Sequence, residues 1–285
     1  MSDTVRAVLL LECYVTVTLL APLLLGRLPL VAQRPVAMLA AWHGFLVTAV
    51  LSLGSGLGLL IHQGMALQAG ARPEEEAVAA IPLAYVAAGV LGVLLFRIVD
   101  EGGRVVREAR RRAGEVATLL LASRPYRVAG RDARIVESDV PLAALSPATG
   151  VILLTTEARA RLDDDEIAAV LEHETAHLEQ RHALAVRIAQ VSRSILPALP
   201  ASQRLALSTT IAIEFIADDH AARVAGPATV ASALTKLDPE GGLSALRADR
   251  MRHPRGGHRV ALRLLCAVAC ALPVLPLVIV LLPPA

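Results

Sequence analysis

Cysteine and aromatic residues are scarce in this sequence, and their scarcity narrows the class of protein. The 285 residues include three cysteines, and aromatic residues make up 2% of the chain. Cys13, Cys266 and Cys270 lie within or beside long apolar runs, so neither a disulfide framework nor a cysteine-rich metal site is expected. The net charge of +2 gives no case for direct nucleic-acid binding.

Charged residues are also few, at 19%, whereas hydrophobic residues make up 55% and gather in long blocks. A helix needs roughly 18 to 20 apolar residues to cross a bilayer. Four blocks reach that length: residues 7–25, 36–61, 77–99 and 264–282. The sequence therefore predicts a mainly α protein with four transmembrane spans, embedded in a lipid bilayer.

The first apolar block has a second reading, a cleaved signal peptide. The block is long for a signal peptide and contains Glu12, and it is followed by Arg27 and Pro29 instead of a small-residue cleavage site. These features favour a retained span.

Arginines flank the predicted spans unevenly, and the imbalance predicts an orientation. Six arginines between residues 97 and 112 follow the third span, and six between residues 247 and 263 lie around the start of the fourth. The loop between spans two and three is acidic instead. Because basic residues stay on the cytoplasmic side, we expect the N terminus outside. The predicted domains are residues 1–99 with three spans, a cytoplasmic domain at 100–259, and the last span at 260–285.

The cytoplasmic segment reads as an α+β domain. Residues 104–121 predict a basic helix that continues from the third span. Residues 133–137 and 150–154 are β-prone runs that we expect to pair in a small sheet. Asp163 and Glu166 fit a capping box at the start of a helix. A second helical region, about residues 202–224, is closed near Gly226 and Pro227.

The first of these helices carries a His-Glu-x-x-His motif at residues 173–177. Positions four apart share a helix face, so His173 and His177 can bind one zinc ion, while Glu174 reaches the water that the metal activates. Glu174 would accept the proton of that water and return it to the leaving amine. The alternative is a chance match on a solvated helix face, but the independent cap at Asp163 favours the motif reading.

A catalytic zinc of this kind needs a third protein ligand, and Glu214 is the best candidate. Glu214 and Asp218 share one face of an otherwise apolar helix, where two carboxylates are costly unless a metal or hydrogen bonds compensate them. Asp218 suits a supporting role, accepting a ring N–H from a ligand histidine. A surface stripe of acids is the alternative.

The remaining histidines are weaker candidates. His182 is nine residues from His173, near the opposite helix face, which favours a structural or solvated role, so replacing His182 by Ala is expected to leave zinc and activity intact. His220 is six residues after Glu214 and likewise faces away. His253 and His258 flank the start of the last span, where each fits either an oxyanion or substrate contact or a juxtamembrane polar contact.

Within the predicted spans, a few residues depart from the apolar pattern. Glu12 and His43 are costly in a bilayer, so they are expected to pair or to take part in signal transfer. Gly54 and Gly58 form a small-xxx-small pair, which predicts close helix packing.

The arrangement resembles the BlaR/MecR-type regulatory zinc metallopeptidases of bacterial membranes. The resemblance rests on His173-Glu-x-x-His177 followed by Glu214-x-x-x-Asp218, with three spans before the motif and one after it. It implies His173, His177 and Glu214 as zinc ligands, Glu174 as acid and base, and a cytoplasmic transcriptional repressor as substrate. By the same resemblance Gly150, Val151, Ile152, Leu153 and Leu154 form an edge strand that lays out the substrate by β-augmentation.

Two departures qualify the resemblance. The penicillin-binding sensor of BlaR and MecR follows their fourth span, and the present sequence shows no such segment. Arg181-His182, His253-Pro254 and Arg259 look more like HtpX-type proteases, yet those place two spans before the motif and two hydrophobic segments after it, whereas residues 183–213 contain three arginines. Topology favours the first family.

The sequence therefore predicts a four-span membrane protein with a cytoplasmic zincin-like domain, acting as a zinc metalloendopeptidase on protein or peptide substrates. Regulated proteolysis of a repressor is the favoured role, and quality control of membrane proteins is the alternative. A non-catalytic signalling scaffold is disfavoured, because a structural zinc site has no use for Glu174. The sequence does not decide between a monomer and a homo-oligomer.

Overall fold

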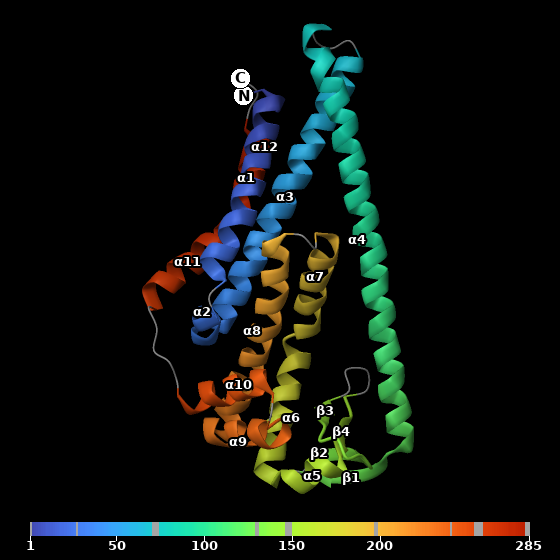
Figure 1. The fold of residues 1–285 in the computed structure, drawn as a ribbon, viewed down its shortest axis with the longest axis vertical. Helices are drawn as coiled ribbons and strands as arrows, with labels where there is room; N and C mark the ends of the chain where they lie inside the picture. Colours follow the sequence, from blue (N-terminus) through green and yellow to red (C-terminus); the bar gives the residue numbers. More distant parts are fainter. Residues whose placement is uncertain are drawn as a thin grey trace. The chain divides into compact units, whose positions relative to one another are not determined.

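The computed structural model is mainly helical and describes most of the chain. Structure is described for residues 2–26, 28–69, 74–128, 131–145, 150–196, 199–239, 241–253 and 259–282. These residues form twelve helices and four strands (Figure 1). They divide into two compact units, which are described separately below.

The first unit consists of Met1–Gly102, Ala189–Ser208 and His258–Ala285, and the second of Gly103–Ile188 and Thr209–Gly257. The sequence predicts one continuous domain at 100–259. In the structure, residues 189–208 of that range cluster with the first unit. Their side chains, among them Ser192, Leu199 and Leu205, line a cavity together with the first helices of the chain. Arg193 and Arg204 lower the mean hydropathy of this segment, so the sequence does not indicate the association.

Three helices of the first unit are long and apolar enough to cross a membrane. They are α1 (Asp3–Leu25), α3 (Pro35–Gln68) and α4 (Glu74–Ala122), with the short α2 (Leu28–Gln33) between the first two. Helix α3 has 34 residues, which corresponds to about 51 Å. Helix α4 runs from its apolar part straight into the basic segment, as the sequence predicts, and β1 follows it at Arg124.

The predicted fourth span is interrupted in the structure. Residues in this part form α11 (Arg259–Ala271) and α12 (Val274–Leu281), of 13 and 8 residues. A turn at Leu272 and Pro273 separates them, because proline lacks the N–H that a continuing helix would need. Neither piece alone is long enough to cross a bilayer, so a fourth span stays a prediction.

Close helix packing occurs at glycines other than the predicted pair. A Cβ at Gly54 or Gly58 would meet nothing within 4 Å, so the expectation for these two positions is wrong. Gly56 lies against Leu11 of α1, where a Cβ would come within 3.2 Å, and Gly64 lies against Ala84 of α4. The phase of the helix, which sequence spacing does not fix, decides which glycine faces a neighbour.

The two intramembrane polar residues are not paired with each other. His43 Nδ1 lies 2.8 Å from the Leu39 carbonyl oxygen of its own helix, and Glu12 is exposed. No ion pair joins them among the described residues.

In the second unit, a small mixed sheet follows the end of α4. Its strands are β1 (Arg124–Val128), β2 (Arg131–Val136), β3 (Ala143–Leu145) and β4 (Ile152–Thr155), in the order β1-β2-β4-β3. The two runs predicted from the sequence correspond to β2 and β4, which pair in parallel with Ala133 opposite Ile152. The prediction of a small sheet is thus confirmed.

The predicted edge strand, however, lies inside the sheet. Strand β4 pairs with β2 on one side and with β3 on the other, so its backbone has no free side for an added strand. Gly150 and Val151 precede the strand. The edge next to β4 is the three-residue β3, whose weak, alanine-rich sequence gave no strand pattern to recognise.

Six helices continue the chain after the sheet. They are α5 (Thr156–Arg161), α6 (Asp164–Glu179), α7 (His182–Ile195), α8 (Pro200–Ala225), α9 (Pro227–Leu237) and α10 (Gly242–Arg252). Ile167 and Leu171 of α6 are fully buried in a core shared with the sheet and α9. Gly226, at φ 86°, makes the sharp turn between α8 and α9 as the sequence predicts.

The start of α6 is held by the predicted capping box and by a second helix. Asp163 accepts the Glu166 N–H, and the Glu166 carboxylate accepts the Asp163 N–H at 3.0 Å. The same carboxylate, almost fully buried, accepts hydrogen bonds of 2.6 Å from Ser232 and Lys236 of α9. Burial would raise the pKa of Glu166, but these hydrogen bonds outweigh it and lower the pKa below its ordinary value.

We expect Glu166→Gln to lower the free energy of unfolding of this unit by about 2 kcal/mol at pH 7, since the substitution removes charge-assisted hydrogen bonds in a buried place. The measurement is thermal unfolding in detergent, together with hydrogen exchange of the first amides of α6. Because the folded pKa is lowered, the contribution is complete above the ordinary glutamate pKa of about 4.3 and is lost as the pH falls through the folded value.

A matched control is Glu157→Gln, because Glu157 makes an ion pair only one helical turn away, with Arg161. Such partly exposed pairs contribute little, and we expect less than about 0.5 kcal/mol. Equal destabilisation by both variants would contradict the role given to Glu166.

Candidate metal centre

The His-Glu-x-x-His motif lies in the last two turns of α6, with both imidazoles on one face. His173 Nε2 and His177 Nε2 are 3.0 Å apart. Both side chains are mostly buried. Glu174 lines the same cavity as the two histidines. A helix that places two ring nitrogens this close directs both of them at one point.

Helix α8 brings a carboxylate to that point from a distant part of the chain. Glu214 Oε2 lies 3.5 Å from His173 Nε2, and Glu214 Oε1 lies 3.6 Å from His177 Nε2. One ligand atom from each of these three residues can be chosen so that all lie within 4.8 Å of one another. The sequence singles out the same three residues.

This donor set fits a zinc ion. Zinc binds imidazole nitrogen at about 2.0–2.1 Å and carboxylate oxygen at about 2.0–2.2 Å in tetrahedral geometry, which places ligand atoms about 3.3–3.6 Å apart. The three observed separations, 3.0, 3.5 and 3.6 Å, surround that range. Two histidines and one glutamate supply three positions and leave a fourth open.

Asp218 lies one turn after Glu214 and orients the first histidine. Its carboxylate is fully buried, and Oδ1 lies 3.0 Å from His173 Nδ1. A carboxylate at Nδ1 keeps the proton on that nitrogen and leaves Nε2 free for a metal. This is the place that the helix spacing predicts for Asp218.

Arg247 of α10 is a member of the centre that sequence reasoning missed. Its guanidinium donates to both carboxylate oxygens of Asp218, at 2.9 and 2.7 Å, and it lies 3.0 Å from Glu214 Oε2. In the sequence, Arg247 is one of the arginines near the last predicted span that predict the orientation of the chain in the membrane. Nothing in the local pattern separates this buried arginine from Arg252, which is exposed.

The electrostatics of the centre favour a cation at the histidines. Burial lowers the pKa of His173, but hydrogen bonds to Asp218 and Glu214 outweigh it and raise the pKa to about 9. Burial and the neighbouring His173 lower the pKa of His177 to about 4. Burial would raise the pKa of both carboxyl groups, but hydrogen bonds to His173 and the Arg247 guanidinium lower it. Both carboxylates are therefore charged at neutral pH.

His182 lies against the second motif histidine, contrary to the expectation that it faces away. His182 Nδ1 is 3.0 Å from His177 Nδ1, and the His182 side chain is buried. The helix ends after Glu179, and Arg181 adopts φ 52°, so α7 starts in a new direction. Counting positions along one continuous helix was the error, and no glycine or proline marks the break.

Two further candidate histidines, His220 and His253, do not belong to the cluster of possible metal ligands. His220 Nε2 is 3.6 Å from Glu172 of α6. His253 is exposed and lies 3.0 Å from Asp249 of its own helix. The predicted contact of His258 lies outside the described residues.

The centre opens into a cavity of about 400 Å³. Part of the lining is polar, with Glu174 and the metal-ligating candidates, and part is apolar, with Val230, Leu234 and Leu237 of α9. Ala143 of β3 also lines the cavity. The cavity within the second unit is thus lined by an edge strand, by apolar side chains of α9 and by the candidate cation site.

Comparison with known proteins agrees with this geometry. Residues 136–261 match the model of peptidase family M48, a stretch that includes β3, β4, the motif helix and the helices of Glu214 and Arg247. The match spans less than half of the chain. No curated protein and no solved structure matches the sequence.

The buried ion pair makes a prediction about stability. We expect Arg247→Ala to lower the free energy of unfolding by about 3–5 kcal/mol, because it leaves the Asp218 carboxylate buried without its cation. Arg247→Lys is expected to recover part of the loss, since it restores the charge without the two-pronged geometry. Thermal unfolding in detergent measures both. Arg252→Ala, an exposed position on the same helix, is the control, and a loss as large as that of Arg247→Ala would refute the assignment.

Proposed function

We propose that this protein is a membrane-bound zinc endopeptidase that uses His173, His177 and Glu214 as zinc ligands and Glu174 as general base and acid. The observation that carries the proposal is the convergence of three ligand atoms from α6 and α8 at separations suited to one zinc ion. The match of residues 136–261 to peptidase family M48 supports the same chemistry.

When bound, zinc supplies a Lewis acid that polarises the peptide carbonyl and makes a water molecule acidic. Glu174 accepts the proton of the attacking water and then donates it to the amine of the cleaved bond. Its position next to His173 in sequence, on the wall of the same cavity, puts its carboxylate within the reaction space. Bond cleavage consumes one water and yields a carboxylate and an amine.

The substrate chain is an extended peptide segment that adds to the edge strand β3. Strand β3 pairs with β4 along one side, and among the described residues no strand occupies its other side. Backbone pairing at this edge holds a peptide extended without regard to its sequence. The apolar wall of α9 then selects an apolar side chain next to the cleaved bond.

Two residues act as positioning groups for the ligands. Asp218 holds the ring of His173, and His182 holds the ring of His177 through their two Nδ1 atoms. A nitrogen at 3.0 Å from His177 Nδ1 accepts its proton, which leaves His177 Nε2 as the metal-binding atom.

The arginine distribution supports a cytoplasmic catalytic domain with the N terminus outside. The role in this proposal is regulated proteolysis of a cytoplasmic repressor, and quality control of damaged membrane proteins is the competing role, favoured by His253-Pro254 and Arg181-His182. Substrate trapping in cells with Glu174→Gln discriminates them. One enriched soluble repressor supports regulation, whereas many membrane fragments support quality control.

We expect Glu174→Gln to reduce peptide cleavage by about 10²- to 10⁴-fold, the usual contribution of general acid–base catalysis. The assay is cleavage of a casein substrate by the full-length protein in detergent with added zinc. Zinc content, measured by atomic absorption, is expected to equal that of the wild type.

This variant also separates an enzyme from a scaffold. Cleavage that persists in Glu174→Gln at the wild-type rate would rule out the proposed base. A cellular function that survives Glu174→Ala intact would support the non-catalytic alternative.

The ligand set makes a separate prediction about zinc affinity. Glu214→Ala is expected to lose zinc at competing chelator concentrations that leave the wild type loaded. Asp218→Asn and His182→Ala are each expected to bind zinc about 10- to 100-fold more weakly, because they lose a positioning contact. His182→Asn, which restores a hydrogen-bond partner, is expected to recover part of the affinity.

His220→Ala is the control for these variants, because His220 lies by Glu172 and away from the cluster. Full zinc affinity in Glu214→Ala, or loss of affinity in His220→Ala equal to that in His182→Ala, would show that the ligand set is wrong.

A further inference from the structure

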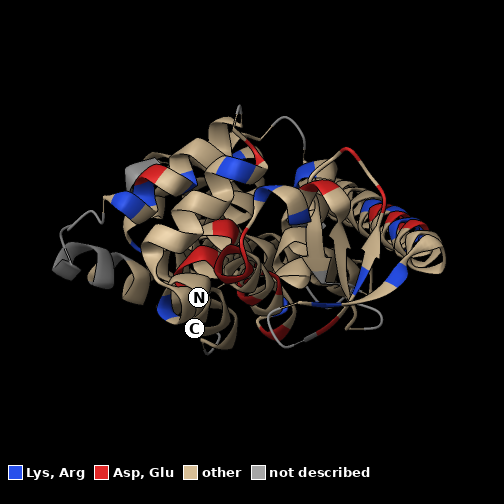
Figure 2. Cartoon of the chain, turned by 90° about the horizontal axis from the view of Figure 1, so that it is seen from below, with Lys and Arg blue, Asp and Glu red and all other residues tan. Residues whose placement is uncertain are grey.

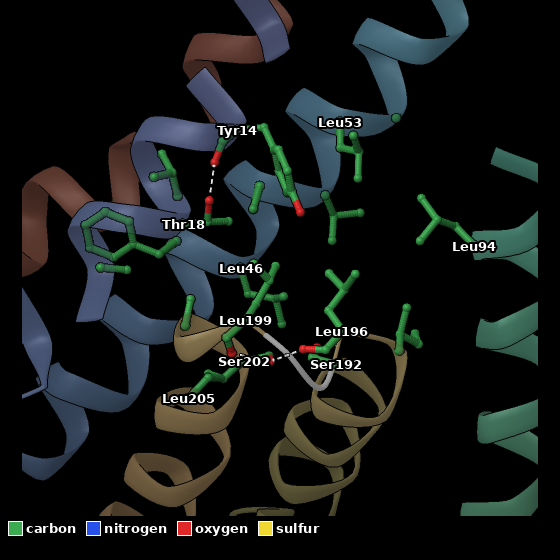
Figure 3. A pocket seen from close by; sticks show the side chains of 18 of the residues that line it. Tyr14, Thr18, Leu46, Leu53, Leu94, Ser192, Leu196, Leu199, Ser202 and Leu205 are labelled. Atoms are coloured by element: carbon green, nitrogen blue, oxygen red, sulfur yellow. Dashed lines mark hydrogen bonds between the residues drawn. The ribbon is translucent and has the colours of Figure 1, made fainter. Parts of the chain in front are cut away.

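The first unit contains a cavity that the proposed peptidase chemistry does not use. Its volume is about 300 Å³, and its lining is almost wholly apolar. Figure 3 shows side chains of α1, α3 and α4 around it, with Leu46, Leu53 and Leu94 among them, and side chains of α7 and α8, such as Ser192 and Leu205, at one end. Because α1, α3 and α4 are the helices suited to cross a membrane, the medium around the cavity is lipid.

The cavity is long and narrow. Its lining residues on α3 recur every three or four positions from Trp42 to Leu57, which corresponds to about 22 Å of helix. A transmembrane helix of a substrate, about 10 Å across, would need several times the available volume over that length. A single hydrocarbon chain fits the shape.

One polar hydrogen in the lining is buried and has no acceptor among the described residues. Trp42 is 2% exposed, and its Nε1–H forms no hydrogen bond with any described residue. Tyr14 is half-buried, and its hydroxyl points into the cavity in Figure 3. Buried donors normally find an acceptor. An occupant with an oxygen acceptor would satisfy the Trp42 N–H.

We propose that this cavity binds one acyl chain, from a membrane lipid or a free fatty acid, whose carbonyl or carboxyl oxygen accepts hydrogen bonds from the lining. Its volume is at the lower limit of pockets that bind small molecules, and such pockets combine apolar walls with a few placed polar groups. Water is a poor occupant, because apolar cavities of this size stay dry. The inference does not depend on the metal centre.

The glycines of α3 offer a matched pair of variants. Gly54 lines the cavity, and a side chain added there meets nothing within 4 Å, so Gly54→Leu fills the cavity without a clash at its Cβ. Gly58, one turn further, is equally open but does not belong to the lining. Trp42→Phe removes the N–H and keeps an aromatic ring.

The test is photolabelling of the full-length protein in lipid nanodiscs with two probes in parallel arms, a diazirine fatty acid and a diazirine phosphatidylcholine. Labelled peptides are identified by mass spectrometry. We expect saturable labelling of peptides from α1, α3 and α4, and the arm with the higher affinity identifies the source of the chain. Gly54→Leu is expected to weaken probe binding about tenfold, and Gly58→Leu to leave it unchanged.

Trp42→Phe keeps the proposal testable if Gly54→Leu fails to fold. Loss of one hydrogen bond is expected to weaken binding about two- to tenfold, without loss of the folded protein by size-exclusion chromatography. Labelling that does not saturate, or that is equal in wild type, Gly54→Leu and Trp42→Phe, would mean that the probes only coat the outer surface of the helices and would overturn the proposal.

Discussion

The candidate metal centre depends on one buried carboxylate. Asp218 has no exposed surface, and a bare charge in that place would cost several kcal/mol. Two groups compensate it, the guanidinium of Arg247 and the ring N–H of His173. Arg247 comes from α10 and His173 from α6. Compensation of one charge on α8 therefore holds these three helices together at the site. The same contact fixes the ring of His173, the first of the proposed metal ligands.

The residues that pack these helices together are small. A core of Ala169 from α6, Ala221 from α8, Ala231 from α9 and Ala248 from α10 allows close approach of four helices. Figure 2 marks the positions of Lys and Arg and of Asp and Glu along the ribbon of the chain. Close packing restricts the rotamers of long polar side chains such as Arg247. Such a side chain therefore contacts a group on the next helix with little further loss of conformational entropy.

The sequence predicts the local features of this fold well. The capping box at Asp163, the turn at Gly226 and the strands β2 and β4 follow from patterns within a few residues. Prediction from the sequence fails for features that depend on contacts between distant segments of the chain. The place of β4 inside the sheet depends on β3, whose three residues carry no strand pattern, and the partner of Asp218 lies 29 positions along the chain. Residues 189–208 cluster with the first unit and line its cavity, an association between distant segments that no local pattern indicates.

The position of His182 shows why spacing alone misleads at the end of a helix. An angle of 100° per residue holds only while the backbone hydrogen bonds continue, and α6 stops at Glu179. One residue with positive φ, Arg181, then redirects the chain, so His182 approaches His177 from the next helix. A non-glycine residue in this conformation is uncommon and costs energy. The turn at Arg181 lets His182 contact the ring of His177. His177 thus has a positioning partner, as His173 has in Asp218.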